Sequence, residues 1–183
     1  MDANMKKRWI SLYVENQVGV LSKISGLFSA KSYNLDSLTV GVTEDPSISR
    51  MTIGLTSDDR TFEQIKKQLN RSVPVIKVMD YTEVPIYRKE ILFVKVTHCS
   101  EEEKREVFRM AGVYEMAVRE YDGDSMLLEC TQTEEKNDRL IDLMKKQFRN
   151  RIEIVRGGSV AITSVGGAAG EKSDSGGQCL RCS

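Results

Sequence analysis

Apolar and polar residues alternate over residues 8–14, which predicts a β-strand with one buried face. Its apolar face would consist of Ile10, Leu12 and Val14, and its opposite face of Trp9, Ser11 and Tyr13. After Gly19, which permits a tight turn, apolar residues recur at helical spacing, at Val20, Leu21, Ile24, Leu27 and Phe28. A second strand would then open at Leu35 and extend to Val42.

Strand-like and helix-like patterns of apolar residues continue up to residue 83. Residues 48–56 alternate as a third strand, with Met51, Ile53 and Leu55 on its covered face. Thr61 is the predicted N-cap of a helix, and residues 73–83 form the fourth strand. The buried stripe of that helix would be Phe62, Ile65 and Leu69. The order strand–helix–strand–strand–helix–strand is that of a ferredoxin-like domain.

The same order starts again after Val84-Pro85, where we place a domain boundary. The predicted elements are a strand over 90–97, a helix from a capping box at Ser100 and Glu103 to about Met110, a hairpin of 113–121 and 126–131, a helix capped by Thr133, and a last strand over 152–162. The fold class is therefore α+β, with two tandem ferredoxin-like βαββαβ domains, residues 1–83 and 84–165, each an antiparallel sheet with helices on one face. Residues 166–183 are rich in Gly and Ser and are expected to be disordered.

The charge balance narrows the classes of partner. The chain has 183 residues, and 27 Lys and Arg are matched by 27 Asp and Glu, which argues against a nucleic-acid or anionic-membrane partner. No apolar run approaches the roughly 20 residues that span a bilayer, and residues 1–8 lack the apolar core of a signal peptide. We therefore expect a soluble cytoplasmic protein.

The sequence contains no recognisable set of catalytic residues. His98 is the single histidine, at the end of a predicted strand, and neither a nucleophile elbow nor a dinucleotide fingerprint is present. Cys179 and Cys182 form a lone C-x-x-C, which favours free thiols over a zinc site because the second ligand pair is missing. We expect no catalytic site, no metal site and no bound cofactor in this chain.

The turn at Gly19 is the candidate binding site. A glycine turn at a helix start leaves backbone N–H groups free, and these groups with the helix dipole favour a small anion such as a carboxylate. Asn16 and Asn34 flank this stretch with amides that both donate and accept hydrogen bonds. A simpler interpretation is that Asn16 only caps the turn and that Asn34 tolerates a left-handed backbone. The residues alone leave both interpretations open.

The run E-N-Q-V-G-V-L-S-K-I-S-G-L-F-S-A-K-S-Y-N-L-D-S-L-T-V (residues 15–40), followed by D-P-S-I-S-R-M-T-I, resembles the small regulatory subunit of acetolactate synthase (acetohydroxyacid synthase), whose first domain is an amino-acid-sensing ACT domain. The pieces E-Q-I-K-K-Q-L, K-E-I-L-F-V-K-V and I-E-I-V-R-G-G also fit, and the resemblance covers most of residues 7–162. Leu35 stands where the family often has isoleucine. The segment 97–113 is somewhat shorter than in the family, and the resemblance stops at residue 166.

The resemblance implies a non-catalytic subunit that activates a large subunit holding thiamine diphosphate, Mg²⁺ and FAD. It also implies feedback inhibition by a branched-chain amino acid, most often valine, with isoleucine and leucine as the other candidates. The effector would bind where the ACT domains of a homodimer pair. The matching effector-binding positions are Asn16, Gly19, Val20, Leu21, Asn34 and Leu35.

Two other functions fit the predicted fold. A stand-alone ACT-type regulator of another enzyme would have the same sequence features. An RNA-recognition module shares the topology and stacks bases on aromatic residues of its central strands. The third strand, residues 49–56, has no aromatic residue and the chain has no excess of positive charge, which argues against RNA binding.

Overall fold

A computed structural model describes residues 5–165 of the chain. The predicted tail 166–183, with Cys179 and Cys182, lies outside the described residues. The first domain comprises β1 (Lys6–Glu15), α1 (Val20–Ala30), β2 (Ser37–Val42), β3 (Ile48–Ser57), α2 (Asp59–Asn70) and β4 (Val75–Asp80). The second comprises β5 (Ile86–Val96), α3 (Glu101–Val113), β6 (Ala117–Tyr121), β7 (Met126–Gln132), α4 (Glu134–Gln147), β8 (Ile152–Arg156) and β9 (Val160–Thr163).

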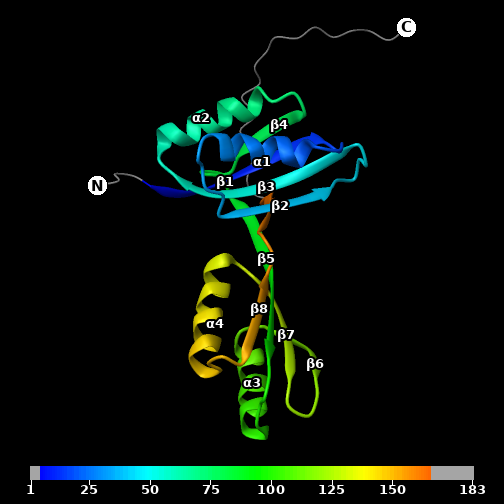
Figure 1. The fold of residues 1–183 in the computed structure, drawn as a ribbon, viewed down its shortest axis with the longest axis vertical. Coiled ribbons are helices and arrows are strands. Elements are labelled where there is room, and N and C mark those ends of the chain that lie inside the picture. Colours follow the sequence, from blue (N-terminus) through cyan, green and yellow to red (C-terminus); the bar gives the residue numbers. More distant parts are fainter. Residues whose placement is uncertain (1–4, 166–183) are drawn as a thin grey trace.

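The two sheets have the same topology. Their strand orders are β2-β3-β1-β4 and β6-β7-β5-β8, with every neighbouring pair antiparallel. In each domain both helices cover one face of the sheet (Figure 1). The predicted tandem ferredoxin-like fold is therefore confirmed.

Each domain has its own apolar core between its sheet and its helices. The first core contains the predicted inner face of β1 and the stripes of α1 and α2, including Ile10, Leu12, Val14, Ile24, Phe28, Phe62, Ile65 and Leu69. The second contains the matching face of β5 with residues of α3 and α4, including Leu92, Val94, Val96, Val107, Leu140 and Met144. These faces were readable from sequence because burial on one side imposes a period of two on strands and of 3.6 on helices.

The prediction that β1 has only one buried face is wrong. Trp9 and Ser11, on the opposite face, are also buried, and Trp9 packs against Tyr81 and Ala161 of β9. The second domain therefore covers part of the open face of the first sheet. The predicted last strand over residues 152–162 is two strands, β8 and β9, which separate at Gly157 and both pair with β5.

Two helix boundaries also differ from the prediction. Asp58, not Thr61, is the N-cap of α2, because its carboxylate accepts a hydrogen bond from Thr61 N at 2.8 Å. Helix α3 continues past Met110 to Val113, so the hairpin strand β6 begins only at Ala117. The apolar residues of 107–113 fit a strand or a helix end equally well, and here the helix continues.

The predicted capping box of α3 is confirmed and has an additional partner. Ser100 Oγ accepts from Glu103 N at 3.2 Å, and Glu103 Oε2 accepts from Ser100 N at 2.9 Å. Arg151, just before β8, donates to both carboxylate oxygens of Glu103, at 3.2 and 2.6 Å. The hydrogen bonds from Arg151 and Ser100 lower the pKa of Glu103 from 4.5 to about 2.

This contact predicts acid sensitivity in the second domain. Replacing Glu103 by Gln should lower the melting temperature at pH 7 by a few degrees at most, because the ion pair is partly exposed. Since the native pKa lies below the unfolded one, the stabilisation is complete above about pH 4.5 and is lost as the pH falls towards 2. The difference between wild type and variant, measured by thermal unfolding, should shrink over that range. A constant difference from pH 7 to pH 2 would contradict the assignment.

Candidate functional site

Gly19 gives the predicted turn its shape. It is the N-cap of α1, with φ 87° and ψ −9°, in the left-handed region that favours glycine. No side chain caps the helix start, and no heavy atom would lie within 4 Å of a Cβ added at Gly19. The N–H of Val20 donates to Gln17 O at 3.3 Å. The space beside Gly19 is open, so the predicted anion could approach the N–H groups that follow Val20 in the first turn of α1.

Asn16 joins the end of β1 to the turn between β2 and β3. Its Nδ2 donates to Pro46 O at 2.9 Å, and its Oδ1 accepts from Ser49 Oγ at 3.0 Å. It therefore does not cap the glycine turn. Each of these amide atoms has a second hydrogen-bonding position, and the side chain is at the surface, so Asn16 can still bind a ligand.

Asn34 lies at the other end of α1, in the exposed loop before β2. The left-handed residue of this loop is Ser32, with φ 57°, so the interpretation that Asn34 is there to adopt that conformation is wrong. Asn34 and Tyr33 line a hollow of about 370 Å³ that also borders Ser57 and Asp58 at the start of α2. Leu35 is half-buried and packs on the first core.

One chain does not bring the six predicted residues together. Asn16, Gly19, Val20 and Leu21 lie at the start of α1, whereas Asn34 and Leu35 follow its end. The helix has 11 residues, which rise about 16 Å. The candidate site is therefore two half-sites, which we name the glycine half-site (residues 16–21) and the asparagine half-site (residues 34–35).

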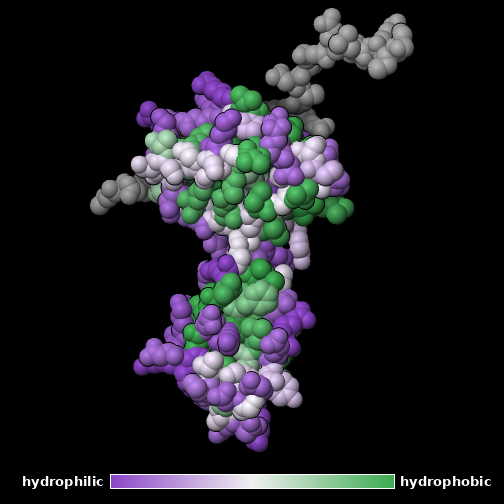
Figure 2. Space-filling model, turned by 45° about the vertical axis from the view of Figure 1, so that its right-hand side comes forward, coloured by the Kyte–Doolittle hydropathy of each residue, from purple (hydrophilic) through white to green (hydrophobic). Residues whose placement is uncertain are grey.

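Exposed apolar side chains surround the glycine half-site and follow the neighbouring edge strand. Val18 is fully exposed, Leu21 is 44% exposed, and Val40 and Val42 of β2 are 48% and 60% exposed. Figure 2 shows apolar surface on both domains. Sequence reasoning did not single out Val18 in the turn, and it missed Val40 and Val42 because exposure at a sheet edge depends on strand order. Apolar groups beside polar ones suit a ligand that has both an aliphatic and a charged part.

The residues that the structure describes form neither a metal site nor a membrane-spanning helix. His98 is an exposed turn residue with φ 55°, and its Nδ1 lies 3.0 Å from Asp124 Oδ2. No group of three or more His, Cys, Asp or Glu within residues 5–165 is arranged to hold a metal ion. None of the helices in that range is long and apolar enough to cross a membrane.

Comparison with known proteins covers both domains. A family model described as the AHAS small subunit-like ACT domain matches residues 10–77, and one described as the small subunit of acetolactate synthase matches residues 89–165. A probable acetolactate synthase small subunit of Archaeoglobus fulgidus is 38% identical over 85% of this chain and 96% of that one. The acetolactate synthase small subunit of Aquifex aeolicus is 37% identical, over 86% of this chain and 81% of that one. A crystal structure of the Thermotoga maritima small subunit superposes with a TM-score of 0.78, at 30% identity, over 87% of this chain and 98% of that one.

Proposed function

We propose, since this chain belongs to the family of acetolactate synthase small subunits, that it activates a catalytic large subunit and makes it sensitive to a branched-chain amino acid. The match of family models to both domains is the observation that carries this proposal. The large subunit would hold thiamine diphosphate, Mg²⁺ and FAD, and would condense pyruvate with pyruvate or 2-oxobutyrate. This chain would contribute regulation only.

The glycine half-site supports binding of an amino acid. The N–H groups that follow Val20 in the first turn of α1 would donate hydrogen bonds to the carboxylate of the effector, helped by the helix dipole. The side-chain oxygens of Asn16 and Asn34 can accept hydrogen bonds from its ammonium group. Leu21 and Val18 offer exposed apolar surface for its aliphatic group. Valine, isoleucine and leucine all meet this description, and valine is the effector we propose.

A homodimer would bring the two half-sites together. Strand β2 is an edge strand that pairs with β3 on one side. It starts two residues after Leu35 and ends at Val42, opposite Ser49, which hydrogen-bonds Asn16. Strand β2 thus leads from the asparagine half-site to the glycine half-site. Antiparallel pairing of two β2 strands about a two-fold axis would place Asn34 of each chain near the glycine half-site of its partner.

This geometry predicts that β2 is the dimer interface. Replacing Val40 by Glu should shift the chain from dimer to monomer in sedimentation velocity, because two like charges would face each other across the two-fold axis. Ile76 on β4, the opposite edge strand, is 55% exposed, and Ile76→Glu is the matched control that should stay dimeric. Valine should strengthen the wild-type dimer, since a ligand shared by two chains stabilises the assembly. Dissociation by Ile76→Glu alone would place the interface on β4.

Reconstitution tests the proposed function itself. The purified chain alone should form no acetolactate from pyruvate. Mixed with its large subunit, it should raise the rate and make that rate fall with added valine. Acetolactate formation by the chain alone, or a large subunit that is indifferent to it, would contradict the proposal.

A further inference from the structure

The second domain touches the first at strand β2. The loop 157–159 between β8 and β9 lies against this strand, with Ser159 N donating to Ser37 Oγ at 3.0 Å and Thr39 Oγ1 donating to Ser159 O at 2.9 Å. A Cβ added at Gly158 would lie 2.7 Å from Thr39 Cγ2 and 3.0 Å from Leu38 O. The loop can approach the strand this closely because residue 158 is glycine.

A buried polar cluster anchors the loop within the second domain. Ser159 is fully buried and its Oγ lies 3.5 Å from Glu90 Oε2. Glu90 is 4% exposed, and its Oε1 accepts from Arg156 Nε at 2.7 Å and from Asn137 Nδ2 at 3.0 Å. Asn137 lies on α4 and Arg156 ends β8. A displacement of Ser159 would therefore disturb contacts that hold α4 and β8, since a buried carboxylate that loses a partner is costly.

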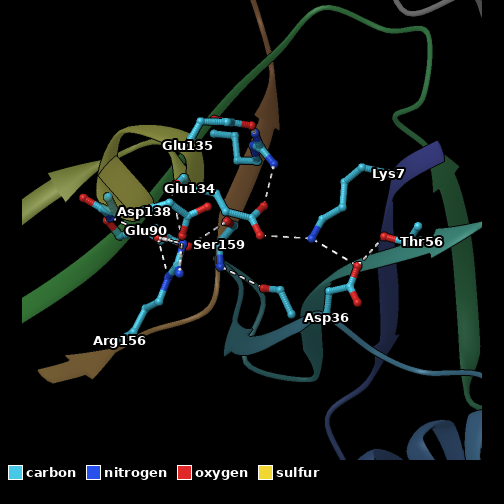
Figure 3. Close-up of polar contacts among 12 residues, drawn as sticks. Lys7, Asp36, Thr56, Glu90, Glu134, Glu135, Asp138, Arg156 and Ser159 are labelled. Carbon is cyan, nitrogen blue, oxygen red and sulfur yellow. Dashed lines mark hydrogen bonds and ion pairs between the residues drawn. The ribbon is translucent and has the colours of Figure 1, made fainter. Parts of the chain in front are cut away.

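A second contact bridges the domains beside this loop. Lys7 Nζ lies between Asp36 Oδ2, at 3.1 Å, and Glu134 Oε1 at the start of α4, at 3.0 Å (Figure 3). Asp36 also accepts from Thr56 Oγ1 at 2.8 Å, and its backbone N–H donates to Gly54 O at 2.9 Å. Lys7 therefore connects α4 to the first residues after the asparagine half-site.

The single tryptophan of the chain lies in the same junction. Trp9 is 6% exposed and packs against Tyr81 and Ala161. The guanidinium of Arg88 lies 4.3 Å from the centroid of its ring, and Nζ of Lys7, two residues earlier on β1, lies 5.5 Å from that centroid. Tryptophan fluorescence will therefore report changes at the contact between the domains.

The Lys7 bridge and the contacts of loop 157–159 involve neighbouring residues of the first domain. Asp36, Ser37 and Thr39 follow directly after Asn34 and Leu35, which form the asparagine half-site. We propose that this segment couples effector binding to the second domain, through the Lys7 bridge and the docked loop 157–159. Lys7 and Thr39 are then positioning residues of the feedback response. The inference rests on the proposed function of the asparagine half-site.

The coupling needs no contact between the effector and the second domain. An effector that fixes Asn34 and Leu35 also restricts Asp36 and the start of β2. Both the Lys7 bridge and the Ser159 hydrogen bonds must then adjust, because they connect that segment to the second domain. Two sites that bias one shared element are coupled energetically and reciprocally.

The test compares the double variant K7M/T39V with K6M in the full chain reconstituted with the large subunit. Lys7→Met keeps the length of the side chain without its charge, and Thr39→Val removes the hydroxyl that donates to Ser159 O. Lys6 precedes Lys7 but pairs with Asp59 of its own domain at 3.9 Å, so K6M is the matched control. Valine affinity is measured by calorimetry and the response of Trp9 by fluorescence on the small subunit before reconstitution, where Trp9 is the single tryptophan. Feedback is measured by the inhibition curve of the reconstituted enzyme.

We expect the double variant to bind valine within about threefold of wild type, since neither residue lies in a half-site. Its maximal inhibition and its valine-induced fluorescence change should each fall at least threefold, whereas K6M should match wild type. If wild type responds to valine and the double variant responds equally, the coupling proposal is wrong and the proposed function stands. If valine, isoleucine and leucine all fail to bind wild type, the effector site is wrong and the coupling proposal fails with it.

Discussion

Replacing Gly19 by Asp should abolish feedback inhibition by valine and leave activation of the large subunit largely intact. Gly19 has φ 87°, which costs an L-residue roughly 1–2 kcal/mol, although Asp tolerates it better than most. The larger effect is charge, because the new carboxylate would stand beside that of the effector. At about 4 Å and an effective dielectric near 20, the repulsion is on the order of 4 kcal/mol before screening. A third of that repulsion weakens binding about tenfold.

Two further variants separate the causes of this effect. Gly19→Ala introduces the backbone strain without the charge, and no atom would lie within 4 Å of its Cβ. It should therefore weaken inhibition less than Gly19→Asp does. Asn34→Ala, at the other half-site, removes hydrogen bonds to a charged ligand worth roughly 1.5–3 kcal/mol. It should weaken inhibition without altering the turn at Gly19.

The measurement is the activity of the reconstituted enzyme against valine concentration. If Gly19→Asp and Asn34→Ala both kept the wild-type inhibition curve, the assignment of the two half-sites would be wrong. If activation disappeared together with inhibition, the turn would be structural or part of the contact with the large subunit.

The second large effect is expected at Gly54, inside the first sheet. A Cβ at this position would lie 2.6 Å from Trp9 Cζ3 and 2.8 Å from Cη2. Trp9 has little room to move, because Tyr81 and Ala161 enclose it. Overpacking of this kind costs about 1–3 kcal/mol, and Gly54→Val adds more than a single Cβ. We expect a loss near the upper end of that range, which is on the order of a hundredfold in the folding equilibrium.

Gly41 provides the control for this prediction. It lies on β2 of the same sheet, and a Cβ there would meet no atom within 4 Å. Gly41→Val should therefore change the stability to urea far less than Gly54→Val does. Equal losses for the two variants would show that the contact between Gly54 and Trp9 does not limit the packing of the junction.

The elements that could be predicted from sequence are those buried on one side within their own domain. The alternation in β1 and β3 and the helical spacing after Gly19 identify the faces that meet in the core of the first domain, and these faces were read correctly. The burial of the opposite face of β1 was not predicted. Trp9 could not be placed, because it is covered by Tyr81, which follows β4, and by Ala161 of the second domain, and neither contact leaves a local period in the sequence. The same reason hid the role of Gly54, which makes room for the indole ring.

The break between β8 and β9 shows a different limit. Residues 152–162 are apolar enough for one strand, and Gly157-Gly158 was the only available sign of an interruption. Gly158 is required by the close approach of this loop to Thr39, which lies more than a hundred residues earlier in the chain, and Gly157 by its close approach to Ile91 of β5. Such a contact depends on how the two domains meet, and sequence alone does not give that arrangement.

The arrangement of the candidate site residues could not be predicted from sequence. The resemblance selected Asn16, Gly19 and Asn34, and the structure shows that these residues lie in two separate places on one chain. An 11-residue helix separates the two groups, and the edge strand β2 connects them. The exposure of Val40 became apparent only from the strand order, which makes β2 an edge strand.

The most direct test of the central claim is to identify the protein that this chain binds in its native cell. The tagged chain is purified at low salt, and its partner is identified by mass spectrometry. We predict recovery of a thiamine-diphosphate-dependent acetolactate synthase large subunit. The Gly19→Asp variant should recover the same partner in the same amount. Stable recovery of a different enzyme, with no acetolactate synthase large subunit, would contradict the account and favour a stand-alone regulator.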